Sequence, residues 1–322
     1  MSKTLLFLVA LAALPSAPAH AQGNYPDRPI RLIVPFPPGG PADALARIAG
    51  GEITRALGQP VVVENKPGAG GNIGMEQGAR AAPDGYTLIL APAGNLTVAP
   101  HLYSKLPYDP AKDFAPITVI AATPNILIVN PAVPARSLQE LIALAKAKPG
   151  TLNYASPGNG SGAHLAGELL KRSAGIDIVH VPFNGVGPAM AAVLGGSVQL
   201  FFAQSSAALQ QIKSGKVIAL GVASPKRIAA APDLPTIAEA GIPDFEVTSW
   251  YALVAPAGTP AVMVAKVQAS VAAALARPEV REKLAGLGAE PIANTPAEFA
   301  AMQRTESARW QKLAREANIR AD

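Results

Sequence analysis

Short apolar runs alternate with longer amphipathic stretches along almost the whole chain. The short runs are rich in β-branched residues and indicate strands, whereas the longer stretches carry apolar residues at helical spacing. The predicted strands cover residues 30–34, 61–64, 86–90, 117–120, 126–129, 152–155, 178–181, 198–202, 217–222 and 251–254. The predicted helices cover residues 43–57, 137–146, 162–173, 188–194, 260–276 and 296–317. This alternation predicts an α/β protein with mostly parallel sheets flanked by helices.

Proline-rich stretches at residues 122–134 and 242–250 each flank an apolar strand. The chain is therefore expected to leave a first domain near Thr123 and to return to it near Thr248. We predict a discontinuous first domain of residues 22–122 plus 249–322 and a continuous second domain of residues 123–248.

Residues 1–21 predict a cleaved secretory signal peptide. Lys3 is followed by an apolar run from Leu5 to Leu14 and by the small-residue end Ala19-His20-Ala21. The alternative, a buried N-terminal helix, fits this ending less well. The chain has no cysteine, which excludes disulfides, thiol chemistry and a lipid-modified cysteine anchor. Because no later apolar run is long enough to span a bilayer, we expect a soluble exported protein.

The formal net charge of +5 is mild, and the basic residues are scattered along the chain. They form no dense stripe with interleaved aromatic residues, so the sequence gives little support to nucleic-acid binding. A weak positive field suits an anionic small molecule better.

The strand at residues 30–34 runs into a proline- and glycine-rich loop that opens a helix. Prolines stiffen this loop, and Gly39 and Gly40 let the backbone approach a ligand where a helix presents unpaired N–H groups. Such a corner suits a carboxylate. Phe36 is expected to pack on the carbon skeleton of the ligand. Asp43 has four possible roles: it binds an ammonium or amide group, caps the helix, orients the loop, or pairs with Arg47 four residues later.

The loops after the other strands are also small, polar or glycine-rich. Because ligands bind beyond the carboxyl ends of strands in open parallel sheets, these loops predict one pocket lined by N–H and hydroxyl donors. For His164 two roles stay open, donation to the ligand and a hydrogen bond within its own loop. The complete set of candidate ligand-binding residues is Phe36, Gly39, Gly40, Asp43, Gly71, Asn72, Ala93, Ser156, Ser161, His164, Phe183, Asn184 and Ser205.

Two enzyme classes compete with a binding function. Gly158-x-Gly160-x-x-Ala163, with Asp177 further on, formally satisfies a dinucleotide fingerprint and would suggest an oxidoreductase, but Asp177 lies at the entry of the next predicted strand instead of its end. A hydrolase or lyase is the other alternative, although Ser161 lacks the Gly-x-Ser-x-Gly elbow. The sequence shows no histidine–carboxylate cluster with metal-ligand spacing, so no metal or other cofactor is expected.

Several motifs spread over the chain resemble the Bug solute receptors, the periplasmic substrate-binding components of tripartite tricarboxylate transporters. The motifs are Tyr25-Pro26-x-Arg28-Pro29-Ile30-Arg31, Val34-Pro35-Phe36-Pro37-Pro38-Gly39-Gly40-x-x-Asp43, Val63-Glu64-Asn65-Lys66-Pro67-Gly68, Pro83-Asp84-Gly85-Tyr86, Ser156-Pro157-Gly158, His180-Val181-Pro182-Phe183 and Val254-Ala255-Pro256-Ala257-Gly258-Thr259-Pro260. The resemblance covers essentially the whole mature chain.

This resemblance implies a two-domain periplasmic-binding-protein fold of the type II kind, with a ligand cleft between the domains. It also implies a non-enzymatic receptor for a small organic, amino or aromatic acid, with membrane transporter subunits as partners. The capture loop at Phe36 to Asp43 is expected to face the loop at Ser156 to His164. Ala42, Phe183-Asn184-Gly185 and Ala203-Gln204-Ser205-Ser206 depart from the common family pattern, so the ligand of a relative does not transfer to this chain.

Overall fold

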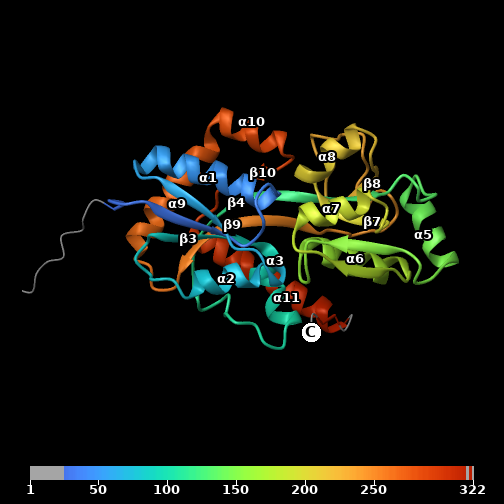
Figure 1. The fold of residues 1–322 in the computed structure, drawn as a ribbon, viewed down its shortest axis with the longest axis horizontal. Helices are drawn as coiled ribbons and strands as arrows, with labels where there is room; N and C mark the ends of the chain where they lie inside the picture. Colours follow the sequence, from blue (N-terminus) through green and yellow to red (C-terminus); the bar gives the residue numbers. More distant parts are fainter. Residues whose placement is uncertain (1–24, 317–318, 321–322) are drawn as a thin grey trace, which may run out of the picture.

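The computed structural model describes residues 25–316 and 319–320, so the predicted signal peptide lies outside the described residues. Figure 1 shows two α/β lobes side by side, joined by long strands that run through both. No helix of the described residues is long and apolar enough to cross a membrane.

The first lobe is built on three parallel strands in the order β2-β1-β3. Its elements up to the first long strand are β1 (Ile30–Val34), α1 (Pro41–Leu57), β2 (Val61–Asn65), the 3-10 turn η1 (Ala69–Gly71), α2 (Asn72–Ala79), β3 (Thr87–Pro92), α3 (Ala93–Thr97) and α4 (Ala99–Leu102). The chain returns to this lobe after the second, adding α9 (Ala261–Ala276), α10 (Pro278–Gly286), β10 (Glu290–Pro291) and α11 (Pro296–Glu316).

The second lobe repeats this plan with the parallel strands β6-β5-β7. Its elements are α5 (Leu138–Ala147), β5 (Asn153–Ser156), α6 (Gly162–Ala174), β6 (Val179–Pro182), α7 (Val186–Leu194), β7 (Leu200–Gln204), α8 (Ser205–Lys213) and β8 (Ile218–Val222). The predicted strand and helix positions in both lobes agree with these elements to within a few residues.

Two long antiparallel strands, β4 (Phe114–Val129) and β9 (Thr248–Pro256), connect the lobes. The predicted strands at residues 117–120 and 126–129 are therefore parts of one strand, and their separation was wrong. Pro124 suggested a break, but it ends the pairing of β4 with β9, and the next residue, Asn125, begins the pairing with β7. Its missing N–H thus falls where the strand changes partners, which is a position that tolerates proline.

The sheets are parallel in their outer parts and antiparallel around the connecting strands. β9 pairs antiparallel with β3 and β4, and β4 pairs antiparallel with β7, β8 and β10. The expectation of mostly parallel sheets therefore holds for the strands that helices connect, β2-β1-β3 and β6-β5-β7. The domain limits at residues 122/123 and 248/249 stay a prediction.

Buried side chains lie on both faces of the first sheet, as its apolar strands predict. Leu32 and Val34 face α1 and α9, whereas Ile33 faces α2 and α11 on the opposite side. A third cluster fills the second lobe around β7 and its flanking helices. Because helices cover both faces, the ends of the strands and their loops are the parts of the sheets left to form a site.

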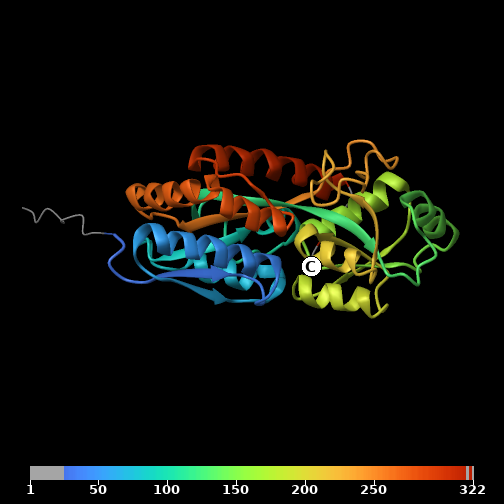
Figure 2. The same ribbon diagram turned by 90° about the horizontal axis from the view of Figure 1, so that it is seen from above.

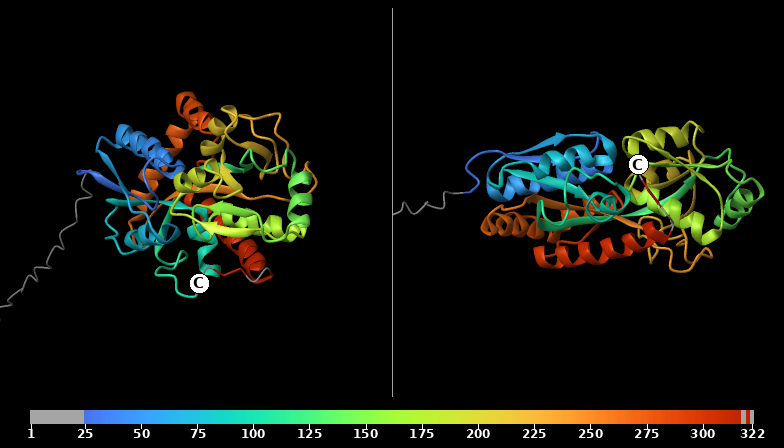
Figure 3. Two further views of the ribbon diagram at one scale, coloured as in Figure 1. Left: turned by 45° about the vertical axis from the view of Figure 1, so that its right-hand side comes forward. Right: turned by 90° about the horizontal axis from the view of Figure 1, so that it is seen from below.

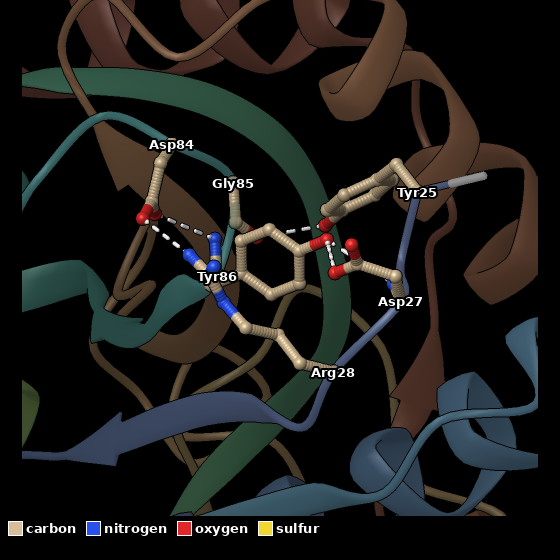
Figure 4. Close-up of polar contacts among 6 residues, drawn as sticks. All are labelled: Tyr25, Asp27, Arg28, Asp84, Gly85 and Tyr86. Atoms are coloured by element: carbon tan, nitrogen blue, oxygen red, sulfur yellow. Dashed lines mark hydrogen bonds and ion pairs between the residues drawn. The ribbon is translucent and has the colours of Figure 1, made fainter. Parts of the chain in front are cut away.

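The start of the described chain is fixed to the first lobe by a polar clamp, which Figure 4 shows. The hydroxyl group of Tyr25 donates to the carbonyl of Gly85 at 2.7 Å, and Arg28 pairs with Asp84 at 3.0 Å. The Arg28 guanidinium lies 3.9 Å from the centroid of the Tyr86 ring. Two of the motifs that carry the family resemblance therefore serve to anchor the first strand.

Candidate functional site

Two adjoining cavities lie between the lobes. The inner cavity, of about 40 Å³, is lined by Phe36, Gly70, Pro92, Ala93, Gly94, Asn95, Ala99, Asn125, Pro157, Asn159, Gly160, Ser161, Gly162, Ala163, Val186, Phe201, Phe202, Gln204, Ser249, Trp250 and Tyr251. The outer cavity, of about 150 Å³, is lined by Phe36, Pro37, Pro38, Gly39, Gly40, Pro41, Ala42, Val186, Gly187, Pro188 and Tyr251. Phe36, Val186 and Tyr251 line both cavities and form the neck between them. All lining residues of both cavities are uncharged.

The starts of helices α1 and α7 face the outer cavity from opposite lobes. Gly40 is the N-cap of α1 and Gly185 that of α7, and neither residue has a side chain to cap the helix. The first-turn N–H groups of a helix have no partner within the helix, and the helix dipole adds partial positive charge there. The outer cavity is therefore suited to an anion although its walls carry no cationic side chain.

Asp43 holds the capture loop in shape. Its Oδ2 accepts hydrogen bonds from the Gly39 amide at 3.0 Å and from Arg47 Nε at 2.9 Å, and its Oδ1 accepts one from Asn65 at 3.1 Å. The Asn65 amide also donates to the carbonyl of Phe36 at 3.0 Å. Of the roles considered for Asp43, the structure shows loop orientation combined with the Arg47 pair. Asn65 was missed, although it lies in one of the motifs shared with the family.

These contacts also determine the charge state of Asp43. Burial by itself raises the pKa of this carboxyl group, but the hydrogen bonds from Arg47, Gly39 and Asn65 outweigh burial and hold the pKa below its usual value. Asp43 is therefore ionised at neutral pH. Because its oxygens are already occupied, the negative charge is directed into the loop.

The second-lobe loop from Ser156 to His164 shares the inner cavity with Phe36, but it lies against Gly70 and Gly94, whereas the rest of the capture loop faces the start of α7. This second-lobe loop is held by a similar internal network. Ser161 is the N-cap of α6, and its Oγ accepts from the His164 amide at 3.3 Å. The Gly160 amide donates to Nδ1 of His164 at 3.1 Å, and Ser156 Oγ lies 2.6 Å from Nε2 of His180. Of the two roles left open for His164, the structure therefore shows the hydrogen bond within its own loop.

The two histidine rings of this network stack on each other. The ring centroids of His164 and His180 are 4.1 Å apart. Burial lowers the pKa of His164 to about 4, and burial together with the His164 ring lowers that of His180 to about 3. Both rings are therefore neutral at pH 7, so Nδ1 of His164 is free to accept the Gly160 hydrogen bond.

The lobes meet through glycine backbones beside the inner cavity. A Cβ atom on Gly94 of the first lobe would lie 2.3 Å from the carbonyl oxygen of Gly160 in the second. A Cβ atom on Gly158 would lie 2.8 Å from the Cα of Gly70. Only glycine permits this approach, so the structure represents a closed arrangement of the lobes.

The structure brings five of the thirteen predicted residues to the cavity walls. Phe36, Ala93 and Ser161 line the inner cavity, and Phe36, Gly39 and Gly40 line the outer one. Asp43, Ser156 and His164 support the two loops from behind. The other predicted residues, Gly71, Asn72, Phe183, Asn184 and Ser205, do not line these cavities, and their contact with a ligand stays a prediction.

Some of these outlying residues have structural partners. Asn72 Oδ1 accepts from Asn95 Nδ2 at 2.8 Å and from the Tyr108 hydroxyl group at 2.9 Å. Ser205 Oγ donates to the Gly288 carbonyl at 2.7 Å. Asn72 and Ser205 therefore have hydrogen-bond partners within the protein and do not line the two cavities.

Sequence reasoning missed the polar side chains on the connecting strands and at the end of β7. Gln204 Nε2 donates to the Tyr251 hydroxyl group at 2.8 Å, and Asn125 Nδ2 donates to the Val247 carbonyl at 2.8 Å. Burial raises the pKa of Tyr251 to about 12, so the phenol stays neutral. Gln204 stands in a segment already noted as departing from the family pattern. Asn125 and Tyr251 lie within strands, where no loop signal marks them.

Comparison with known proteins identifies the family to which this chain belongs. The model of the tripartite tricarboxylate transporter family receptor matches residues 45–319. The chain belongs to this family. The family resemblance inferred from the sequence motifs is therefore confirmed, as is the prediction of a receptor rather than an enzyme. Within the described residues, no group of three or more histidine, cysteine, aspartate or glutamate side chains could hold a metal ion.

Relatives and solved structures of this receptor family cover nearly the whole chain. Protein BugT of Bordetella pertussis is 39% identical over 94% of this chain and 92% of its own. The structure of Rpa4515 of R. palustris with adipate is 37% identical, with a TM-score of 0.90, and covers 92% of this chain and 99% of the other. MatC of Rhodopseudomonas palustris with bound malate is 38% identical, with a TM-score of 0.85, over 90% and 99% of the two chains. The two-domain periplasmic-binding-protein fold is thus confirmed.

Proposed function

We propose that this receptor is exported to the periplasm, captures a small carboxylate in the two cavities between its lobes and delivers it to membrane subunits of a tripartite transporter. The observation that carries the proposal is the outer cavity, where the starts of α1 and α7 face each other across uncharged walls. Backbone N–H groups and helix dipoles can bind a carboxylate at such a place without a cationic side chain. Rpa4515 with adipate and MatC with malate, both more than a third identical to this chain, support the ligand class.

Export is supported by the signal-peptide pattern of residues 1–21 and by the family to which the chain belongs. The membrane subunits follow from the family description alone. Closing the lobes around an anion orders both loops, so a partner that recognises the closed form would distinguish loaded from empty receptor.

Thermal unfolding with a panel of small acids tests the proposal. The purified mature protein is heated with adipate, malate, succinate and benzoate, and in parallel with adipamide, which has the length of adipate without its charge. We expect at least one acid to raise the unfolding temperature saturably, because a ligand that binds only the folded state stabilises it by about 2.7 kcal/mol at 100 times its Kd. Adipamide should have a much smaller effect.

Mass spectrometry of the same incubations tests the enzyme alternative. We expect every acid to be recovered unchanged. Conversion of a bound acid into a product would overturn the receptor proposal, and equal stabilisation by adipate and adipamide would overturn the carboxylate site. Addition of millimolar NAD tests the alternative of a dinucleotide-binding oxidoreductase. That alternative predicts a higher unfolding temperature with NAD, whereas we expect no change.

A further inference from the structure

The two connecting strands have a cavity on each of their faces. Asn125 and Ser249 line the inner cavity, whereas their neighbours Pro124 and Thr248 line a second hollow of about 610 Å³, here called the rear groove. This division follows from strand geometry, because successive side chains point to opposite faces. The rear groove is also lined by Trp250, Met302, Glu306, Arg309 and Trp310. Trp250 is thus the residue through which the ligand cavity and the rear groove meet.

Glu306 fixes the indole of Trp250 from the rear side. Its Oε2 accepts a hydrogen bond from Trp250 Nε1 at 2.6 Å, and its Oε1 accepts one from Trp310 Nε1 at 3.0 Å. An indole has a single donor, so the bond to Glu306 uses the whole hydrogen-bonding capacity of the Trp250 side chain. Burial raises the pKa of Glu306 above its usual value, and the two indole bonds reverse only part of that rise. A carboxylate in this place costs desolvation free energy, of which the two charge-assisted hydrogen bonds recover a part.

The helix that carries Glu306 packs against both lobes. Near its start, Phe299 lies in the core of the first lobe and packs edge to face on Trp250, with the ring centroids 5.7 Å apart. Near its end, Trp310 and Ala314 lie in the core of the second lobe. Figures 2 and 3 show α11 running along one side of the molecule from one lobe to the other. Glu306 therefore joins an indole of the first lobe's core to an indole of the second.

We propose that Glu306 is a positioning residue of the ligand site: through Trp250 it fixes one wall of the inner cavity and holds the two lobes at the angle that closes the cleft. Glu306 does not line the inner cavity. Its effect on ligand affinity must therefore pass through Trp250 and the lobe angle. The inference rests on the proposed function for its ligand, but its effect on Trp250 exists in the empty protein as well.

The experiment uses the two tryptophans of the chain, which are both members of this cluster. Binding of adipate and malate is measured by titration for the natural protein and for Glu306→Ala and Glu306→Gln. Gln303→Ala is the matched control, because Gln303 makes a bond from the same helix to Pro110 of the first lobe alone. Acrylamide quenching is then measured in a Trp310→Phe background, where Trp250 is the sole emitter.

We expect Glu306→Ala to weaken binding by about tenfold or more, since a hydrogen bond to a charged group is worth roughly 1.5–3 kcal/mol and 1.4 kcal/mol is tenfold in Kd. Glu306→Gln, which can accept one of the two indole bonds, should fall between Ala and the natural protein, and Gln303→Ala should bind normally. In the Trp310→Phe background, acrylamide should quench the fluorescence of Trp250 more strongly when Glu306→Ala is added, even without ligand.

Natural affinity and unchanged quenching in folded Glu306→Ala would overturn the inference. If that variant does not fold, the same two readouts on Glu306→Gln decide. If none of the acids binds the natural protein, the proposed function fails, while the quenching of Trp250 still decides on the role of Glu306.

Discussion

The imidazole ring of His164 stacks on that of His180, and Nδ1 of His164 accepts the amide of Gly160 on the loop that closes the inner cavity. The acceptor role requires a neutral His164 ring. The folded protein lowers the pKa of His164 to about 4 and that of His180 to about 3, from 6.5 in an unfolded chain. Both groups therefore bind protons more weakly in the folded state.

The stability that these rings contribute should be present above about pH 6.5 and should be lost as the pH falls toward 4 and 3, because the unfolded state binds more protons in that window. Urea unfolding at pH 7, 5.5 and 4 measures the effect. In the His164→Asn variant, asparagine keeps an acceptor near the position of Nδ1 but does not titrate. The free energy of unfolding of this variant should therefore decrease less than that of the natural protein as the pH is lowered. An identical pH dependence of both proteins would contradict this role for His164.

Gly94→Ala should prevent full closure of the cleft. The new methyl group would lie 2.3 Å from the carbonyl oxygen of Gly160, so the lobes must separate. We expect ligand affinity to fall by about tenfold or more, which corresponds to 1.4 kcal/mol or more of lost binding free energy, and small-angle scattering with ligand should report a larger radius of gyration.

Gly51→Ala is the matched control for this substitution, because a Cβ atom there meets nothing within 4 Å and the residue lies within α1. It should bind normally and raise the free energy of unfolding by about 0.5–1 kcal/mol, as alanine does in a helix. Natural affinity of Gly94→Ala would show that the lobes need not approach at this point.

Asp43→Ala should cost both stability and affinity. It removes the acceptor of the Gly39 and Asn65 donors in two part-buried hydrogen bonds, and a hydrogen bond to a charged group is worth about 1.5–3 kcal/mol at most. Chemical denaturation and calorimetric titration measure the two losses. Arg47→Ala separates the loop contacts from the ion pair, because the Arg47 side chain is 57% exposed and such i, i+4 pairs contribute only about 0.3–0.5 kcal/mol. Equal losses in both variants would show that the ion pair carries the effect.

Gly40→Val should weaken carboxylate binding while the protein stays folded. Gly40 has φ of −86°, which valine can adopt, and the position lines the outer cavity. Gly39→Val is a less clear test because φ of 81° strains any branched residue there. We expect a loss of affinity of about tenfold or more for Gly40→Val, equivalent to 1.4 kcal/mol. Unchanged affinity in titration calorimetry would remove this part of the capture loop from the site.

The sequence predicted the loops of the site better than its walls, for a physical reason. The capture loop is specified locally, because a strand, two prolines, two glycines and a helix start are consecutive in the chain. Asn125 and Tyr251 line the inner cavity through the pairing of β4 with β9, which joins residues more than a hundred positions apart. Pattern alone does not determine such a register. The same pairing explains why β4 was divided into two strands at Pro124.

The glycine contacts that bring the lobes together do not involve the side chains that line the ligand cavity. Because Gly94 meets Gly160, and Gly70 meets Gly158, through backbone atoms alone, these contacts form in the same way whatever molecule the cavity holds. Gln204 and Asn125 line the same cavity, but their side chains take no part in these backbone contacts. In protein engineering, the backbone contacts between the lobes could therefore be kept while a few side chains that line the cavity are redesigned for a new acid.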